Sequence, residues 1–172
     1  MENFKSIIKT LVIAFILSLG IRTYVAEAKV IPTESMVPTI KVGERVLVDK
    51  IYFKLDELKH EDIVVFRPTT ELLKKGYKDD FIKRVIGLPG DNIIIRSGVV
   101  YVNNNPINEP YINEKPNQDY GPIKVPADSL FVMGDNRNYS SDSREWGFVP
   151  MENVKGRAII KFWPLNRIEL VK

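Results

Sequence analysis

The chain is dominated by short runs of β-forming residues that turn residues separate. These runs, rich in Val, Ile and Phe, occupy residues 45–48, 62–66, 81–86, 92–95, 99–102, 130–133 and 158–163. Between them, Leu-Pro-Gly-Asp at 88–91 and Asn-Asn-Asn-Pro at 103–106 are typical of sharp turns. Many short strands of this kind predict a mainly β domain, an antiparallel β-sandwich or distorted barrel.

Two segments lack a regular period. Residues 67–80 are largely polar, with a short helix expected at 71–75, and residues 108–122 are polar and contain proline. We expect both to be long surface loops, which in compact domains often carry function. The chain contains no internal repeat, so one domain of ordinary size accounts for the residues that follow the N-terminal segment.

The N-terminal segment is apolar. No charged residue lies between Lys9 and Arg22, and a helix over residues 7–25 would be about 28 Å long, close to the hydrocarbon thickness of a bilayer. A cleaved signal peptide is the competing interpretation, with an apolar stretch at 11–19 and an A-x-A site at 26–28. The segment alone leaves both open, and the matched cations on its two sides leave its orientation open.

The composition limits which nucleophile and which base a hydrolytic enzyme of this sequence could use. The chain has no cysteine and one histidine, His60, which lies in a charged stretch before an expected strand. A thiol nucleophile is therefore impossible, and a Ser/His/Asp triad has no histidine to spare. A serine with a lysine base remains open. The Ser-x-x-Lys helix of the penicillin-binding type is excluded because Pro38 stands three residues after Ser35.

Charge and ligand types argue against two further classes of function. The formal net charge is +3, but Lys and Arg are scattered among nearly as many acids, so no nucleic-acid partner is expected. Acid pairs such as Asp79 and Asp80 lack an accompanying ligand set. We therefore expect neither a metal site nor a cofactor.

Lys83 lies in the expected strand at 81–86. Strand alternation places it on the same face as Phe81 and Val85. Lysine serves as a base only when its pKa falls well below about 10.4, and burial among apolar groups achieves this because the ammonium loses its hydration. The alternative is an edge-strand lysine whose amine reaches water, and the strand alone favours that alternative.

A dense polar segment, residues 134–144, follows the expected strand at 130–133. It contains Gly-Asp-Asn-Arg and Ser-x-Asp-Ser-Arg, which taken singly are typical of a solvated turn. Ser-Met-x-Pro-Thr begins at Ser35, and Ile-Lys-Arg-Val-Ile-Gly-Leu-Pro-Gly-Asp surrounds Lys83. With these motifs in this order after an apolar segment, the chain closely resembles the type I signal peptidases, membrane-anchored Ser/Lys proteases that remove signal peptides from exported proteins. The resemblance extends nearly to the end of the chain, and the compact size is similar to that of members from Gram-positive bacteria.

The resemblance implies a role for each matching position. Ser35 would be the nucleophile and Lys83 the general base. The backbone N–H of Ser35 and the hydroxyl of Thr33 would hold the oxyanion. The other implied roles are supporting ones: Ser140 would aim the Lys83 amine, and Asp142 and Arg144 would pair to brace their loop.

The resemblance also implies the substrate, the signal peptide of an exported preprotein. Shallow pockets walled by Ile31 and Ile82 would admit only small side chains, so cleavage would follow Ala-x-Ala. Asn138 and Tyr139 depart from the family pattern, in which Asp-Asn is frequent. This departure puts auxiliary hydrogen bonds of the 134–144 loop in doubt.

The family would retain the N-terminal segment as an anchor. Residues 1–28 would be the anchor, and residues 29–172 a catalytic domain on the extracytoplasmic face of the cell membrane, close to the lipid bilayer. The A-x-A sequence at 26–28 then becomes a candidate self-cleavage site. Two other functions remain: a soluble self-cleaving Ser/Lys protease of the repressor type, against which the apolar segment argues, and a non-catalytic anchored β domain that captures exported chains.

Overall fold

The computed structural model describes residues 2–20, 25–51 and 57–171. The predicted mainly β, antiparallel fold is confirmed. The larger of two sheets contains β1 (Ala26–Val30), β2 (Arg45–Asp49), β3 (Ile63–Phe66), β4 (Phe81–Gly87), β9 (Ser129–Met133), β10 (Val149–Pro150), β11 (Val154–Trp163) and β12 (Glu169–Leu170). The smaller sheet contains β5 (Asn92–Arg96), β6 (Val99–Val102), β7 (Asn105–Pro106) and β8 (Tyr120–Lys124).

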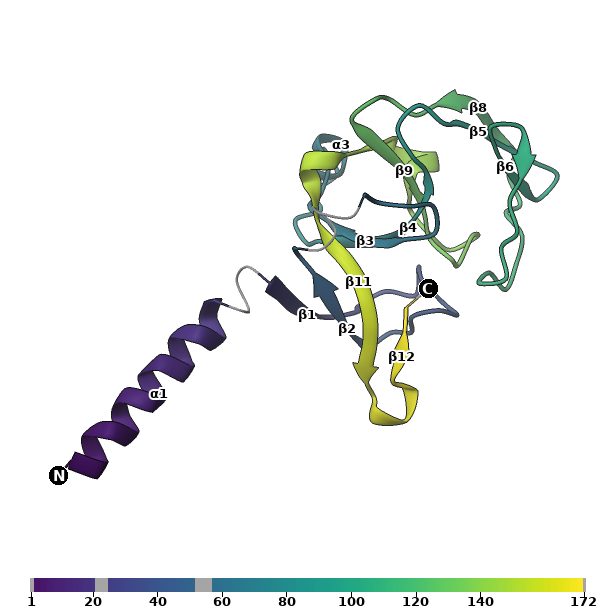
Figure 1. Ribbon diagram of the computed structural model, residues 1–172. Helices are drawn as coiled ribbons and strands as arrows, with labels where there is room; N and C mark the ends of the chain where they lie inside the picture. Colours follow the sequence, from purple (N-terminus) through teal and green to yellow (C-terminus); the bar gives the residue numbers. More distant parts are fainter. Residues whose placement is uncertain (1, 21–24, 52–56, 172) are drawn as a thin grey trace.

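The larger sheet is curled and open. Within the described residues its strand order is β1-β2-β11-β3-β4-β9-β10, with β12 paired to β11, and the smaller sheet has the order β7-β6-β5-β8. Figure 1 shows the larger sheet rolling partly around itself, with the smaller sheet at one end. The architecture is therefore a half-barrel with an added sheet rather than a sandwich.

Each strand expected from the sequence is present, and the turns between them form as predicted. The Asp91 N–H donates to the Leu88 carbonyl at 3.0 Å, which closes the turn between β4 and β5. Asn103 and Asn104 have φ of 52° and 67° in the β6–β7 hairpin, a left-handed conformation that asparagine tolerates well. The expected short helix is α3 (Thr70–Lys74), which Thr69 caps by accepting from the Leu72 N–H.

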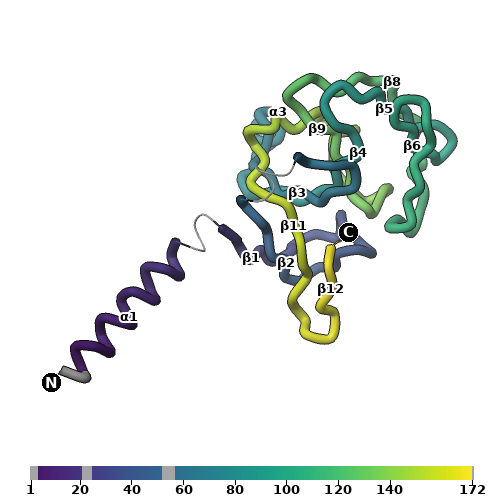
Figure 2. The backbone as a smooth tube through the Cα atoms, in the orientation of Figure 1, coloured from purple at the N-terminus to yellow at the C-terminus, as the bar shows by residue number. Residues whose placement is uncertain are grey.

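The N-terminal helix α1 (Glu2–Gly20) starts and ends earlier than the predicted helix over 7–25. Residues 21–24, and with them Arg22, lie outside the described residues. Figures 1 and 2 show α1 standing away from the sheets, and apolar side chains such as Phe4, Leu11 and Phe15 are 63 to 67% exposed. Among the described residues, no helix combines the length and the hydropathy of a membrane span.

The A-x-A sequence at 26–28 lies in β1, so strand structure begins before residue 29. The strand pairs with β2 along its whole length, from Ala26 opposite Asp49 to Val30 opposite Arg45. The carboxylate of Glu27, the second residue of the strand, also forms ion pairs with Lys29 and Lys50. Cleavage after Ala28 would therefore require β1 to leave the sheet.

Candidate active site

Ser35 lies in a turn of residues 33–39 that follows β1, called here the nucleophile turn after the role predicted for Ser35. The turn is fixed from below because Met36 and Ile40 are fully buried in the core. It is fixed from the side by Asn136, whose backbone N–H donates to the Ser35 carbonyl and whose side chain donates to the Glu34 carbonyl, both at 3.1 Å. These contacts hold the Ser35 side chain in place while it remains 7% exposed.

Lys83 reaches Ser35 from the middle of β4. Its Nζ donates to Ser35 Oγ at 2.7 Å and to the Ile82 carbonyl at 3.0 Å. The Phe81 ring centre lies 5.7 Å from the amine, and Lys83 is only 3% exposed. β4 pairs on both sides, with β3 and β9. The edge-strand interpretation of Lys83 is therefore wrong, and its predicted burial is confirmed.

Burial is the main influence on the Lys83 amine. Loss of hydration lowers the pKa of Lys83 to about 8, although the negative charges of Asp142 and Asp135 act in the opposite direction. Both carboxylates are bound to arginines: Asp142 to Arg144 and Asp135 to Arg84. A usable fraction of the amine is therefore neutral near pH 7 and can accept a proton from a hydroxyl.

Thr33 lies beside Ser35, with its Oγ1 3.2 Å from Ser35 Oγ. The hydrogen bond predicted from Ser140 to the Lys83 amine does not form in the structure. Ser140 Oγ is buried and has no hydrogen-bond partner, because the amine points at Ser35 and Ile82 instead. A Cβ placed on Gly134 would collide with Ser140 Oγ and the Ser35 carbonyl, so the close approach of these two loops requires glycine.

The predicted pair of Asp142 and Arg144 is confirmed. Arg144 Nε and Nη2 each donate to the Asp142 carboxylate at 2.8 Å, in bidentate fashion. The same carboxylate accepts the Gly134 N–H at 3.0 Å, and Arg144 Nη2 donates to the Arg137 carbonyl at 2.6 Å. This pair therefore ties the start of the 134–144 loop to its end.

A second buried ion pair, which was not predicted from the sequence, involves Arg84, the residue after Lys83 in β4. Arg84 Nε and Nη2 donate to the two oxygens of Asp135 at 2.8 and 2.6 Å, and both side chains are fully buried. Thr39 Oγ1 donates to the same carboxylate at 2.5 Å, and the Tyr111 ring lies 3.9 Å from the guanidinium carbon. The Lys-Arg dipeptide in a strand was the available signal, because alternation sends the two cations to opposite faces.

Asn138 makes the auxiliary hydrogen bonds that its departure from the family pattern had put in doubt. Its Oδ1 accepts the Asn117 N–H at 3.0 Å. Its Nδ2 donates to Glu114 Oε2 and to the Lys115 carbonyl, both at 3.1 Å. Asn138 therefore fastens the polar segment before β8 to the 134–144 loop.

The dyad opens onto a groove of about 580 Å³, called here the substrate groove. Residues 32–35 form one wall and residues 76–83 the other, with Tyr139 and Ser141 beside them. Ile82 lines the groove as predicted. Ile31 does not; it is 2% exposed and packs in the core cluster that also contains Ile82.

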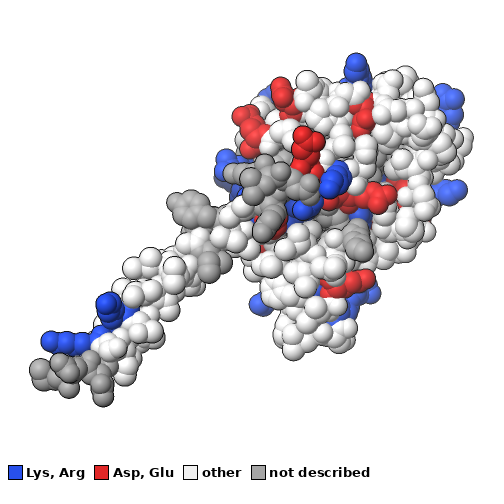
Figure 3. Space-filling model, in the orientation of Figure 1, with Lys and Arg blue, Asp and Glu red and all other residues white. Residues whose placement is uncertain are grey.

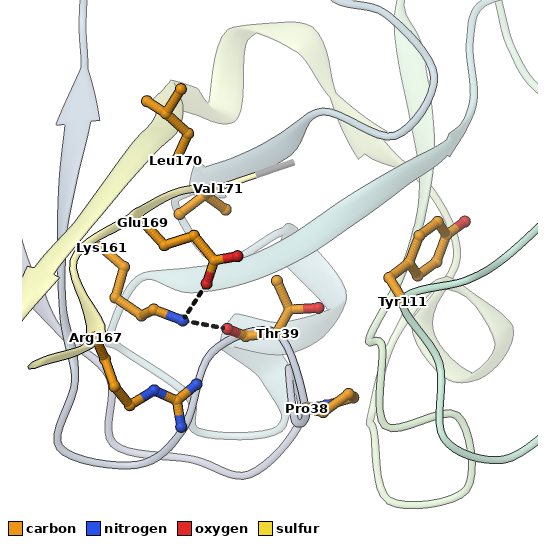
Figure 4. A pocket seen from close by; sticks show the side chains of 8 residues that line it. All are labelled: Pro38, Thr39, Tyr111, Lys161, Arg167, Glu169, Leu170 and Val171. Atoms are coloured by element: carbon orange, nitrogen blue, oxygen red, sulfur yellow. Dashed lines mark hydrogen bonds and ion pairs between the residues drawn. The ribbon is translucent and has the colours of Figure 1, made fainter.

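A smaller cavity of about 310 Å³ lies behind the nucleophile turn (Figure 4). Lys161 from β11 is buried there, and its Nζ donates to the Thr39 carbonyl at 3.1 Å and to Glu169 at 3.3 Å. Arg167 pairs with the buried Glu44 at 2.8 Å. Both cations of the cavity thus have carboxylate partners, and Lys161 supports the back of the nucleophile turn.

His60, the histidine of the chain, pairs with Asp91 at 2.7 Å and is far more exposed than the dyad. Among the described residues, no group of three or more His, Cys, Asp or Glu side chains is arranged to hold a metal ion. In the groove itself, the Ser35 hydroxyl lies beside the desolvated Lys83 amine, an arrangement suited to nucleophilic attack on a carbonyl.

Comparison with known proteins agrees with this geometry. Residues 4–163 match the family described as "Signal peptidase, peptidase S26". The chain belongs to this family. The probable signal peptidase I-2 of Synechocystis sp. is 50% identical over 163 residues, 95% of this chain and 75% of that protein. The signal peptidase I of Leptolyngbya laminosa is 49% identical over 94% of this chain and 80% of its own.

The fold has a solved counterpart in the same family. A crystal structure of a signal peptidase I from Enterococcus faecalis V583 is 30% identical, with a TM-score of 0.50, over 59% of this chain and 97% of that one. The chain is a peptidase of the signal peptidase family, and the recognition, function and enzyme class predicted from its motifs are confirmed. This membership sets aside the repressor-type protease and the non-catalytic capture domain.

Proposed function

We propose that this signal peptidase uses Ser35 and Lys83 as its catalytic dyad and cuts exported preproteins after Ala-x-Ala. One observation carries the proposal: the buried Lys83 Nζ lies 2.7 Å from Ser35 Oγ. That distance is within direct reach for proton transfer. Burial lowers the pKa of Lys83 to about 8, so the amine can act as a base without a histidine.

In the acylation step, neutral Lys83 takes the proton of the Ser35 hydroxyl as Oγ attacks the scissile carbonyl. The C–O bond forms, and the carbonyl electrons move to the oxygen, which the Ser35 N–H and the Thr33 hydroxyl would stabilise. When the intermediate collapses, the C–N bond breaks, and the Lys83 ammonium gives its proton to the departing amine. The product is an ester of Ser35 and a free new N-terminus.

Deacylation repeats the same proton transfers with water. Lys83, again neutral, takes a proton from a water molecule as that water attacks the ester carbonyl. Collapse of the second intermediate returns the proton to Ser35 Oγ and releases the signal peptide with a free carboxylate. Asp142 and Arg144 would support both steps by tying the two ends of the 134–144 loop together, and Asn136 joins this loop to the nucleophile turn.

Selection for small side chains would come from the apolar floor of the substrate groove. Ile82 lines the groove directly, and Ile31 packs in the same core cluster, so Ile82 has no room to retreat from a larger side chain. Each added methylene changes binding by only about 1 to 3 kcal/mol, so crowding has to supply the discrimination. Ala-x-Ala sequences satisfy this limit.

The N-terminal helix would hold the enzyme at the bilayer, with the β domain on the extracytoplasmic face. Two features of α1 support this part of the proposal. Its apolar side chains are exposed, and Figure 3 shows a mostly uncharged surface along the helix, with basic side chains toward its N-terminal end. The anchor would end before Ala26, where β1 begins.

Cleavage of an Ala-x-Ala precursor in detergent tests the dyad. Ser35→Ala and Lys83→Ala are each expected to abolish product, with circular dichroism showing an unchanged fold. Lys124→Ala, which removes an exposed lysine in the smaller sheet, is the matched control and is expected to cleave normally. Turnover retained by either dyad variant, at more than about a hundredth of the normal rate, would refute the assignment.

A further inference from the structure

The two walls of the substrate groove are joined by an ion-pair chain centred on Asp80. This residue ends the exposed part of the 76–83 wall and leads directly into β4. Its Oδ2 accepts a hydrogen bond from Lys29 Nζ and another from Lys155 Nζ, both at 2.8 Å. Its Oδ1 also lies 2.8 Å from Lys155 Nζ. The Asp80 side chain is 16% exposed, so both contacts are partly shielded from water.

The partners of Asp80 come from distant parts of the fold. Lys29 belongs to β1, which runs straight into the other wall of the groove and the nucleophile turn. Lys155 belongs to β11, which pairs with β2 and β3 near the centre of the larger sheet. One carboxylate therefore connects both groove walls to the sheet beneath them.

Lys29 extends this chain of alternating charges toward β2. It lies 2.7 Å from the Glu27 carboxylate, which also pairs with Lys50 at 2.8 Å. Hydrogen bonds from Lys29 and Lys50 lower the pKa of Glu27 to about 2. Burial alone would raise the pKa of Asp80, yet hydrogen bonds from Lys155 and Lys29 hold it below its ordinary value. Glu27 and Asp80, the two carboxylates of this ion-pair chain, are thus ionised at neutral pH.

The ion-pair chain around Asp80 is separate from the Ser35 and Lys83 side chains. The carboxylates that act on the Lys83 pKa are Asp142 and Asp135, which form their ion pairs with Arg144 and Arg84 and not with Lys29 or Lys155. Asp80 contacts neither Ser35 nor Lys83 through any hydrogen bond of the described residues. Any effect of Asp80 on Ser35 and Lys83 would therefore pass through the position of the groove walls, of which it forms a part.

We infer that Asp80 is a positioning residue for precursor binding: clamped by Lys29 and Lys155, it fixes the spacing of the two walls that grip the extended signal peptide. The inference rests on the proposed function of the groove. Loss of the clamp loosens the 76–83 wall, so peptide contacts that are made equally in the ground state and the transition state weaken. Such a loss raises KM and leaves kcat nearly unchanged.

Asp80→Asn tests the clamp because it removes the charge and keeps the shape. KM for an Ala-x-Ala precursor is expected to rise about tenfold, with kcat within about twofold of normal and the pH dependence of kcat/KM unchanged. Glu71→Gln is the matched control, since it breaks a 2.7 Å ion pair with Lys74 on the exposed face of α3. This control is expected to leave KM, kcat and the pH dependence as they are.

A mutant cycle shows whether Asp80 acts through its partners. The Lys29→Gln/Lys155→Gln double variant is expected to reproduce the rise in KM, and adding Asp80→Asn to it is expected to cause no further rise. A fall in kcat at normal KM, an unchanged KM, or an additive effect in the triple variant would each overturn the inference. Should Asp80→Asn fail to fold, Lys155→Gln replaces it in the KM test. This variant removes one side of the clamp, and Asp80 keeps its ion pair with Lys29, which favours folding.

The dyad variants keep this outcome distinct from that of the proposed function. If Ser35→Ala is inactive and Asp80→Asn has a normal KM, only the clamp is refuted. If Ser35→Ala remains active, the dyad is refuted whatever Asp80→Asn does.

Discussion

Lys83 and Arg84 are adjacent basic residues on β4 and both are buried, but their contact partners differ. Lys83 contacts a hydroxyl and a carbonyl, and its nearest carboxylates are bound to arginines. Arg84 has a bidentate carboxylate partner in Asp135, a carbonyl from Glu61 and an aromatic ring against its face. One cation is left without a counter-charge in contact, and the other is fully paired.

The difference shows how a single strand can supply both a base and a brace. A buried charge without a partner is costly, so the group gives up its proton when its chemistry allows. Lysine can do this and arginine cannot, because guanidinium stays protonated under all ordinary conditions. The unpaired face of β4 therefore carries an amine that can lose its proton, whereas the paired face holds Asp135, at the start of the 134–144 loop, in a fully buried ion pair.

Replacing Lys83 with arginine is expected to have the largest effect on turnover, because it puts a permanent charge on the unpaired face of β4. Lys83→Arg is expected to lower precursor turnover by about 10² to 10⁴-fold, the usual contribution of a general base. Arg84→Lys serves as the reciprocal variant, because it leaves the Lys83 amine in place and should keep far more activity. Comparable turnover in these two variants would contradict the division of roles.

Removing the partner of Arg84 tests the paired face. Asp135→Asn leaves a fully buried guanidinium without a counter-charge, and we expect the free energy of unfolding to fall by about 3 to 5 kcal/mol. Urea denaturation measures this loss. Glu71→Gln breaks an exposed ion pair and should cost under about 1 kcal/mol. Equal losses in both variants would show that the burial of Arg84 has no energetic consequence.

The strands of the core were predictable because their residues carry the signal themselves. Runs such as β3 and β9 are almost wholly buried, and all but one of their residues are apolar. β1 and β8 gave no such signal: β1 alternates Ala with charged residues, and β8 contains Gly121 and Pro122. Pairing with β2 and β5 makes them strands, which is tertiary context that a local pattern cannot report.

The site was predictable where its residues fall in contiguous motifs. Ser35 and Lys83 stand in such motifs, although only the structure places them in contact across 48 residues of chain. The ion pairs of Asp80 reach 51 and 75 residues away, to isolated lysines in unremarkable sequence. The predicted bond of Ser140 failed for a related reason, because the direction of the Lys83 amine depends on packing around Phe81 and Ile82.

The pH dependence of kcat/KM is the test of the Lys83 and Arg84 contrast with the smallest expected effect. In the proposed mechanism the neutral amine is the active form, and burial lowers the pKa of Lys83 from 10.5 to about 8. Hence kcat/KM should rise about tenfold per pH unit below that pKa and level off above it. A guanidinium stays protonated under all ordinary conditions, so the rise reports the lysine of this pair of cations. Precursor cleavage from about pH 6 to pH 10, with circular dichroism at each pH as the control for folding, measures the curve. A rise centred near the ordinary lysine pKa would mean that water reaches the amine, and the contrast between the two faces of β4 would then be lost.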